Sequence, residues 1–256
     1  MEYNNLFSCE NRTAVVTGGA GLIGREIVKG LCQYGANVYI ADQNDLNVKT
    51  VTQQNVKFIG LDITSEKSVN DVVNKIVLEN GKIDILINCA YPRTKDWGAK
   101  FENVKFESWK QNVDNHLGGY FLMCKETAMR MKDSGGGSII NLASIYGVVA
   151  PDLSIYEGTE MTMPVAYASI KSGIISMTNY IATCYGGNSI RANTISPGGI
   201  YDNQSPSFVE KYSRKTPLGR MGKPEEIVGA VIYLASDASS FVTGQNIIID
   251  GGWTTW

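Results

Sequence analysis

The chain has 256 residues, a length that allows one large domain or two small ones with a sizeable core. Its 43% hydrophobic and 19% charged residues exclude a disordered chain, and no uncharged apolar run approaches the ~18 residues of a membrane span. Lys and Arg number 23 against 25 Asp and Glu, so without a basic excess we expect a small molecule or a second copy of the chain as partner, and neither nucleic acid nor a membrane.

The cysteines and the first residues of the chain favour a reducing, cytoplasmic setting. The five cysteines are odd in number, widely spaced and without a CxxC pair, so neither a disulfide framework nor a metal site is expected. Residues 1–10 are polar and lack the apolar segment of a secretory signal.

Short apolar runs alternate with helix-period segments along the whole chain. The runs are almost continuously apolar, which predicts strands covered on both faces. We predict strands at residues 14–17, 38–41, 58–61, 83–88, 138–142, 190–196 and 246–250. We predict helices at residues 22–34, 66–79, 104–132, 165–185 and 224–234.

This alternation predicts a single α/β domain over residues 1–256. Strand–helix alternation is typical of a Rossmann-type, doubly wound fold, here a seven-stranded parallel sheet with helices on both faces. Ligands of such sheets bind beyond the carboxyl ends of the strands, so the residues that follow each strand are the candidates for a functional site.

A glycine-rich turn follows the first predicted strand. Gly18, Gly21 and Gly24 allow a tight turn, and Leu22 and Ile23 open the next helix, whose N-terminus attracts a pyrophosphate. Glycines also serve plain tight turns, but the position of this motif between strand and helix favours a dinucleotide.

Asp42 stands at the end of the second predicted strand. A carboxylate there accepts hydrogen bonds from ribose hydroxyls and repels a 2′-phosphate, which favours NAD over NADP. The alternative is that Asp42 merely begins a polar turn.

Tyr167 and Lys171 are four residues apart on a predicted helix and therefore face the same way. A free tyrosine titrates near ~10, and a neighbouring ammonium lowers that pKa toward the range of a useful base. Such a pair also occurs by chance on helix surfaces.

The order of these and further motifs resembles the short-chain dehydrogenase/reductase superfamily in its compact single-domain form. The resemblance extends from about Thr13 to Gly252. Further landmarks are Asp62 after the third strand, Asn88-Cys89-Ala90-Tyr91 after the fourth, Ser144 after the fifth, Pro197-Gly198-Gly199-Ile200 after the sixth and the C-terminal Asp250-Gly251-Gly252.

The resemblance implies a role for each matching residue. Tyr167 would be the acid/base, Lys171 would lower its pKa and bind the nicotinamide ribose, and Ser144 would polarise the substrate oxygen. The remaining cofactor positions would be Asp62 and Ile63 beside the adenine, Asn88 and Ala90 along the cofactor, and Pro197, Gly198, Gly199 and Ile200 at the nicotinamide.

The chain also departs from the family pattern. Leu22 stands where compact members have the middle glycine of the turn, and Tyr91 puts a bulky ring where they have a glycine. His116 takes the place of the catalytic asparagine. It either joins the proton relay, since imidazole titrates near ~6.5, or is a helix histidine without a chemical duty.

The substrate is expected to be polar and hydroxylated. A longer gap than the family usual separates Ser144 from Tyr167, which predicts an extra loop beside the substrate. Candidate substrate contacts are Tyr91, Arg93, Tyr146 and Tyr201. The motif around Tyr167 is also loosely similar to oxidoreductases linked to bacterial surface-sugar or flagellin modification.

The leading hypothesis is therefore an NAD(P)(H)-dependent oxidoreductase that interconverts an alcohol and a carbonyl, on a molecule that is a candidate sugar derivative. Two alternatives stay open: an NADPH-dependent reductase of 3-ketoacyl groups, and a non-catalytic dinucleotide-binding sensor. The resemblance implies a homodimer or homotetramer.

Overall fold

A parallel sheet of seven strands forms the centre of the computed structural model, which describes residues 3–45 and 55–256. The strands run in the order β3-β2-β1-β4-β5-β6-β7, and each neighbouring pair is parallel. The strands are β1 (Thr13–Thr17), β2 (Asn37–Asp42), β3 (Val56–Gly60), β4 (Ile85–Asn88), β5 (Gly137–Leu142), β6 (Ile190–Pro197) and β7 (Asn246–Ile249).

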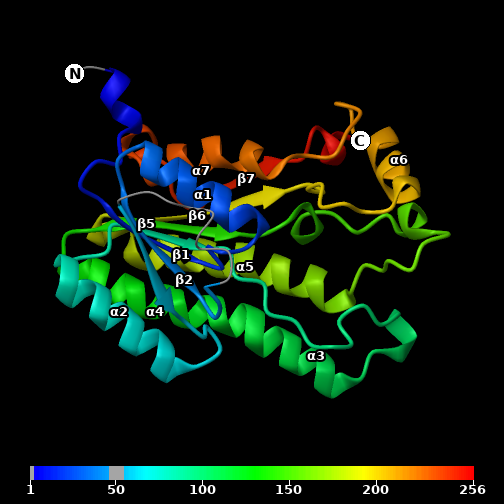
Figure 1. Ribbon diagram of the computed structural model, residues 1–256, viewed down its shortest axis with the longest axis horizontal. Coiled ribbons are helices and arrows are strands. Elements are labelled where there is room, and N and C mark those ends of the chain that lie inside the picture. Colours follow the sequence, from blue (N-terminus) through cyan, green and yellow to red (C-terminus); the bar gives the residue numbers. More distant parts are fainter. Residues whose placement is uncertain (1–2, 46–54) are drawn as a thin grey trace.

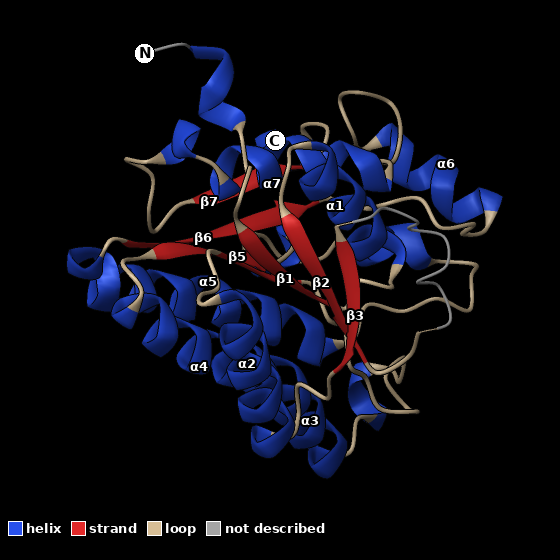
Figure 2. Cartoon of the chain, turned by 60° about the vertical axis from the view of Figure 1, so that its left-hand side comes forward, coloured by secondary structure: helices blue, strands red, loops and turns tan. Residues whose placement is uncertain are grey.

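Helices cover both faces of the sheet (Figures 1 and 2). One layer consists of α1 (Leu22–Gln33) and α7 (Val228–Ala235). The other consists of α2 (Glu66–Asn80), α4 (Gly119–Asp133) and α5 (Val165–Tyr185), with α3 (Phe106–Val113) leading into α4. A further helix, α6 (Pro206–Arg214), lies to one side of these layers.

The side chains of the apolar strands pack into two hydrophobic cores, one on each face of the sheet. In β1 the side chain of Val15 joins the core beneath α2, α4 and α5, whereas Ala14 and Val16 join the core beneath α1 and α7. Successive side chains of a strand point to opposite faces, so a strand with helices on both sides must be apolar at every position. The predicted doubly wound α/β fold is confirmed.

Two predicted helices differ in detail from the structure. The helix expected at residues 104–132 is interrupted by a π-helical turn, Asp114–Gly118, between α3 and α4. The helix expected at 224–234 begins as a 3-10 turn, Pro224–Ile227, and becomes α-helical only in α7. Helix α6 was not predicted, although Ser205 before Pro206 is a helix-start signal and its hydroxyl accepts a hydrogen bond from the N–H of Phe208.

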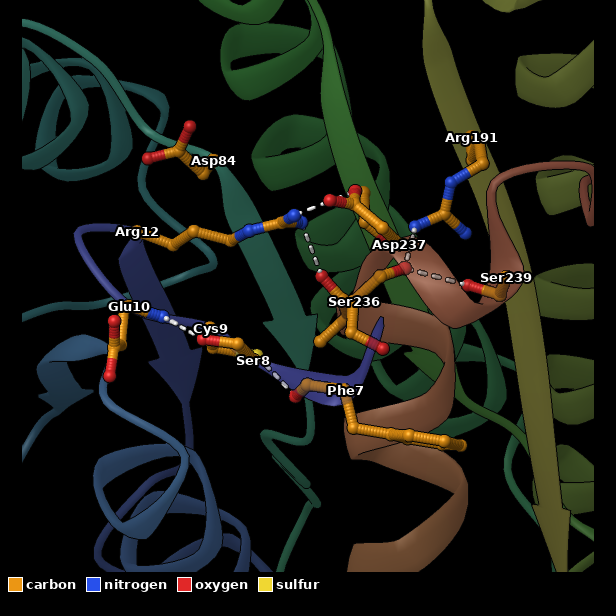
Figure 3. A network of polar contacts seen from close by, with 12 residues as sticks. Phe7, Ser8, Cys9, Glu10, Arg12, Asp84, Arg191, Ser236, Asp237 and Ser239 are labelled. Carbon is orange, nitrogen blue, oxygen red and sulfur yellow. Dashed lines mark hydrogen bonds and ion pairs between the residues drawn. The ribbon is translucent and has the colours of Figure 1, made fainter. Parts of the chain in front are cut away.

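A polar network ties the amino-terminal edge of the sheet to the end of α7 (Figure 3). Arg191, near the start of β6, donates to the carbonyls of Leu234 at 2.7 Å and Ser236 at 3.2 Å. Arg12, just before β1, donates to the carbonyl of Ala235 at 2.9 Å and pairs with Asp237 at 2.7 Å. Cationic side chains are favourable at a helix C-terminus, where the last carbonyls lack intrahelical partners.

None of the helices in the described part of the chain combines the length and the apolar character needed to cross a bilayer.

Candidate active site

A cavity of about 940 Å³ lies beyond the carboxyl ends of the strands. Its walls include residues that directly follow four strands, namely Gly18 after β1, Cys89 after β4, Ala143 after β5 and Gly198 after β6, and Asp42 at the end of β2. Parallel strands end at the same edge of a sheet, so the fold collects these positions from distant parts of the chain.

The glycine-rich turn lines this cavity. Gly18 has a φ of +65°, and a Cβ there would lie 2.6 Å from the Cα of Ala90. A Cβ on Gly24 would lie 2.2 Å from the carbonyl oxygen of Gly18. Only glycine therefore permits this close packing of the turn against its neighbours.

The first turn of α1 faces the same part of the cavity. Gly21 is the N-cap of α1 and supplies no side-chain cap, and Leu22, Ile23 and Gly24 all line the cavity. Uncapped N–H groups at a helix N-terminus favour an anion. The turn and helix start therefore fit the pyrophosphate of a dinucleotide.

Asp42 lines the cavity next to this turn. One of its carboxylate oxygens accepts a hydrogen bond from the N–H of Ala20 at 3.1 Å, and the other accepts from the N–H of Gln43 at 2.8 Å. The backbone thus fixes the carboxylate where ribose hydroxyls of a bound dinucleotide are expected.

The two residues predicted beside the adenine lie differently. Ile63 lines the cavity, whereas Asp62 does not. The Asp62 carboxylate accepts from the Thr64 N–H at 2.9 Å and from the Thr64 hydroxyl at 2.7 Å, and hydrogen bonding to Thr64 lowers its pKa. In the structure the Asp62 side chain closes a local turn before α2.

Ser144, Tyr167 and Lys171 lie together on the cavity wall, Ser144 just after β5 and the other two on α5. The Lys171 Nζ donates to the carbonyl of Leu142 at 2.7 Å and lies 5.6 Å from the centre of the Tyr167 ring. The three residues expected to carry the chemistry are thus assembled from two separate elements.

Burial dominates the pKa values of this group. It raises the pKa of Tyr167, and a hydrogen bond with Ser144 opposes that shift. It lowers the pKa of Lys171 from 10.5 to about 7. The expected lowering of the Tyr167 pKa is therefore not met: desolvation of the phenolate outweighs the stabilisation that its neighbours provide.

His116 lies behind this group, on the π-helical turn Asp114–Gly118, and does not line the cavity. Its side chain is fully buried, and its Nε2 lies 3.4 Å from the Nζ of Lys171. Burial, followed by the charge of Lys171, holds the pKa of His116 well below 6.5. Its Nδ1 has no hydrogen-bond partner among the described residues.

Asn88 also lies behind the cavity wall. Its Nδ2 donates to the Oδ1 of Asn141 at 2.9 Å, and its own Oδ1 accepts from the Thr17 hydroxyl at 3.3 Å. Asn88 thereby joins β1, β4 and β5 below the positions that face the cavity. Ala90, two residues later, lines the cavity itself.

An aromatic cluster forms the wall beside Tyr167. The ring centre of Tyr91 lies 5.7 Å from that of Trp97 and 5.9 Å from that of Tyr167, in edge-on contacts. Arg93 lines the cavity with its guanidinium carbon 5.6 Å from the Tyr91 ring centre. Tyr91 thus occupies space next to the expected acid/base.

Further parts of the wall come from two segments after β5 and β6. Tyr146 and Tyr156 line the cavity from the chain between β5 and α5, and Phe208 and Tyr212 line it from α6. Tyr156 belongs to the segment after Ser144 that was expected beside the substrate, whereas sequence analysis missed Phe208 and Tyr212. The Phe208–Tyr212 spacing was the available signal, since residues four apart share a helix face.

The segment after β6 contains the residues that were predicted to hold the nicotinamide. Pro197, Gly198, Gly199 and Ile200 all line the cavity, and the Tyr212 hydroxyl accepts a hydrogen bond from the N–H of Gly199. Tyr201 is 47% exposed and does not line the cavity, so the structure does not bring it together with the other predicted substrate contacts.

The chain is similar to known proteins over almost its whole length. Residues 18–254 match the model of a protein family described as enoyl-(acyl carrier protein) reductase. The chain is 36% identical to the post-translational flagellin modification protein A of Campylobacter coli, covering 95% of this chain and 98% of that protein. It is 34% identical to the NAD-dependent glycerol dehydrogenase of Listeria innocua, covering 97% of this chain and 96% of that protein.

Solved structures show the same fold. A short chain dehydrogenase from Leptospira borgpetersenii with bound NAD+ has a TM-score of 0.89 and 37% sequence identity to this chain. The match covers 99% of this chain and 96% of the other.

Proposed function

Because this chain belongs to the short-chain dehydrogenase/reductase family and is an NAD(P)-dependent oxidoreductase, we propose that it interconverts an alcohol and a carbonyl on a polar, hydroxylated small molecule with NAD as cofactor. The observation that carries the proposal is a single cavity lined by Ser144, Tyr167 and Lys171 at one place and by the glycine-rich turn at another.

Each residue has a role in this proposal. The glycine-rich turn, Asp42 and Lys171 would hold NAD, and NAD would supply hydride chemistry at the substrate carbon when bound. In oxidation the alcohol C–H bond supplies that hydride, Tyr167 takes the hydroxyl proton, and a C=O double bond forms. Ser144 hydrogen-bonds the reacting oxygen, and Lys171 holds the nicotinamide ribose and provides an exit for the proton.

His116 would extend the path of the proton. Its Nε2 lies 3.4 Å from the Lys171 Nζ, and its low pKa keeps the imidazole neutral, so one ring nitrogen can accept a hydrogen bond while the other donates.

Asp42 supports NAD as the cofactor. Its carboxylate is fixed by two backbone N–H groups beside the glycine-rich turn, where it would accept from both ribose hydroxyls and repel a 2′-phosphate. The substrate proposal is supported by the tyrosines of the cavity wall and by the similarity to a glycerol dehydrogenase. The homodimer or homotetramer implied by the family stays part of this proposal.

Tyr167→Phe is the test of the proposed function. We expect wild type to bind NADH more tightly than NADPH in fluorescence titrations and to turn over members of an alcohol and ketone panel. Tyr167→Phe should lower kcat by at least about 100-fold, since it removes the proton acceptor, while NADH affinity changes less than about threefold.

The same experiment separates the alternatives. Tight dinucleotide binding without turnover that depends on Tyr167 would favour a sensor. A preference for NADPH together with reduction of 3-ketoacyl substrates would favour the acyl reductase.

A further inference from the structure

The loop after β6 contributes bare backbone to the cavity wall. Gly198 and Gly199 line the cavity between Pro197 and Ile200, in the segment that was predicted to hold the nicotinamide. Two consecutive glycines leave the backbone with more conformational freedom than other residues would. Contacts from elsewhere in the chain must therefore fix the position of this loop.

Tyr212 of α6 is a side chain that packs directly on the loop. Its hydroxyl oxygen accepts a hydrogen bond from the N–H of Gly199. A Cβ on Gly199 would lie 2.7 Å from the Tyr212 ring, and a Cβ on Gly198 would lie 2.9 Å from the Tyr212 hydroxyl oxygen. The carbonyl of Gly199 accepts from the N–H of Gly222 at 2.9 Å. Both polar groups of the Gly199 backbone are thus occupied, the carbonyl by backbone and the N–H by Tyr212.

A second aromatic ring fixes the ring of Tyr212. Trp253 belongs to the C-terminal 3-10 turn, Trp253–Thr255, which lies beside α6 (Figure 1). The ring centres of Trp253 and Tyr212 are 4.3 Å apart, with an angle of 20° between the planes, and the two residues are 7% and 2% exposed. A buried, stacked pair has little freedom to rotate, so the Tyr212 hydroxyl is held at one position against the loop.

Asp250 shapes the turn that carries Trp253. One oxygen of its carboxylate accepts from the N–H of Gly252 at 2.8 Å, and the other accepts from the N–H and the hydroxyl of Thr254, both at 2.8 Å. Gly252 has a φ of +93°, and a Cβ there would lie 2.6 Å from the Cγ of Pro217, just after α6. The C-terminal turn is therefore a fixed support for α6 and for Tyr212.

We propose that Tyr212 is a positioning residue of the enzyme: its hydroxyl, held by Trp253, fixes the backbone of Gly199 and with it the nicotinamide end of the cofactor site. This inference rests on the proposed function and assigns Tyr212 no contact with the reacting atoms. Tyr212 would act on the orientation of the nicotinamide relative to Tyr167 and leave the adenosine end, at the glycine-rich turn, unaffected.

The titration of Tyr212 separates this role from that of a proton carrier. Burial, the largest cause, raises the pKa of Tyr212 to about 12, so the phenol stays protonated across the neutral range and is a poor base there. The pH–rate profile of Tyr212→Phe should therefore keep the shape of the wild-type profile.

Binding of NADH and of ADP-ribose tests the two ends of the site separately, because ADP-ribose lacks the nicotinamide. In calorimetric titrations of the full chain we expect Tyr212→Phe to weaken NADH binding by about 5- to 30-fold, because the loop must then be ordered on binding. The affinity for ADP-ribose should change less than about twofold, because its contacts are elsewhere. Phenylalanine keeps the ring that stacks on Trp253, so only the hydroxyl contact is lost.

Turnover gives a second readout. With the panel alcohol that wild type oxidises fastest, at saturating NAD, Tyr212→Phe should lower kcat by at least about tenfold, because hydride transfer depends steeply on the orientation of the reacting groups.

Tyr39→Phe is the matched control. Tyr39 on β2 is 3% exposed, its hydroxyl donates to the Glu79 carboxylate at 2.7 Å, and it does not line the cavity. Each variant removes a hydrogen bond of a buried phenol and should lower the Tm. Only Tyr212→Phe should change kcat and the affinity for NADH.

Trp253→Leu tests whether Trp253 acts through Tyr212. At a temperature where this variant is folded, it should show the same selective loss of NADH affinity. Added to Tyr212→Phe it should cause no further loss, because the hydroxyl contact that Trp253 supports is already absent.

The inference is overturned if Tyr212→Phe weakens NADH and ADP-ribose equally, or if it behaves like Tyr39→Phe, since the hydroxyl then has only a structural role. It is also overturned if wild type binds NADH no more tightly than ADP-ribose, and turnover of the panel then decides the proposed function by itself. If wild type binds NADH but turns over no member of the panel, the proposed function fails, and the comparison of NADH with ADP-ribose still decides whether Tyr212 fixes the nicotinamide end.

Discussion

Burial shifts the pKa values of Tyr167 and Lys171 in opposite directions. It raises the pKa of the phenol and lowers the pKa of the ammonium to about 7, so near neutral pH the phenol is neutral and Lys171 is divided between its charged and neutral forms. A neutral phenol is a ready proton donor for carbonyl reduction, and a lysine near pH 7 can exchange a proton at little cost.

The lowered pKa of Lys171 predicts a pH-dependent contribution to stability. Between pH values of about 7 and 10.5, Lys171 holds a proton in the unfolded chain that it has released in the folded chain. The free energy of unfolding therefore rises with pH across this window, and the contribution of Lys171 is least favourable below it. We expect the free energy of unfolding of wild type, relative to Lys171→Met, to increase by about 1 kcal/mol per pH unit from pH 7.5 to 9.5. Urea denaturation at several pH values measures it, and a constant difference would contradict the buried, neutral lysine.

His116 gives a second prediction at this scale. If it completes the proton path, His116→Leu should lower kcat by about 10- to 100-fold without weakening NADH binding. His116→Asn should keep more activity, because an amide still offers a donor and an acceptor, but with an altered pH–rate profile. A rate and profile equal to wild type in His116→Asn would mean that the imidazole has no special part in proton transfer.

Among the elements, the link between β1 and α1 is the most sterically constrained part of the cofactor end. A Cβ at position 24 would meet the carbonyl oxygen of Gly18 at 2.2 Å, and that contact is with backbone, which has no alternative rotamer to adopt.

Gly24→Ala should therefore weaken NADH binding at least tenfold and destabilise the chain by about 1–3 kcal/mol. Gly229→Ala on α7 is the matched control. Gly229 is exposed and a Cβ there meets nothing within 4 Å, so this change should be neutral or stabilising. Fluorescence titration and denaturation measure both effects, and equal behaviour of the two variants would refute the tight packing of the turn.

The π-helical turn is the second element with a direct consequence for the site. A π-turn inserts an extra residue into a helix and is frequent at functional sites. Here it lies between α3 and α4 and carries His116 into contact with Lys171. Apolar periodicity predicted a helix across this region, but it carries no signal for a local change in the number of residues per turn.

In the whole molecule, the cavity and the Arg191 network lie at opposite ends of the parallel strands. The cavity follows the carboxyl ends of the strands, whereas Arg191 and Arg12 lie at the amino ends and hold the end of α7 (Figure 3). Stability and chemistry are therefore separable by mutation.

Arg191→Met should lower the free energy of unfolding by about 2–4 kcal/mol, because it leaves the carbonyls of Leu234 and Ser236 without this donor. The kinetic constants of the folded enzyme should stay at wild-type values. Lys67→Met removes an exposed ion pair with Asp71 and should change neither property measurably. A lower kcat of Arg191→Met, at a temperature where the variant is folded, would show that the two ends of the strands are coupled.

Local patterns in the sequence determined the strand and helix order, the glycine-rich turn and the placement of Tyr167 and Lys171 on one helix face. These features depend on residues that are neighbours along the chain, where period and backbone freedom act directly. The approach of Ser144 to Tyr167 was expected from the topology of a parallel sheet and from the family resemblance.

Only the tertiary structure decided which polar groups are buried and which partners they find. Three contacts join segments that are distant in sequence. His116 packs against Lys171, Asn88 bonds Asn141 behind the cavity wall, and Tyr156 packs against Phe208 of α6. Desolvation depends on every atom packed around a group, wherever those atoms lie in the chain. For that reason the direction in which the pKa of Tyr167 shifts followed from the packed structure and not from the spacing between Tyr167 and Lys171.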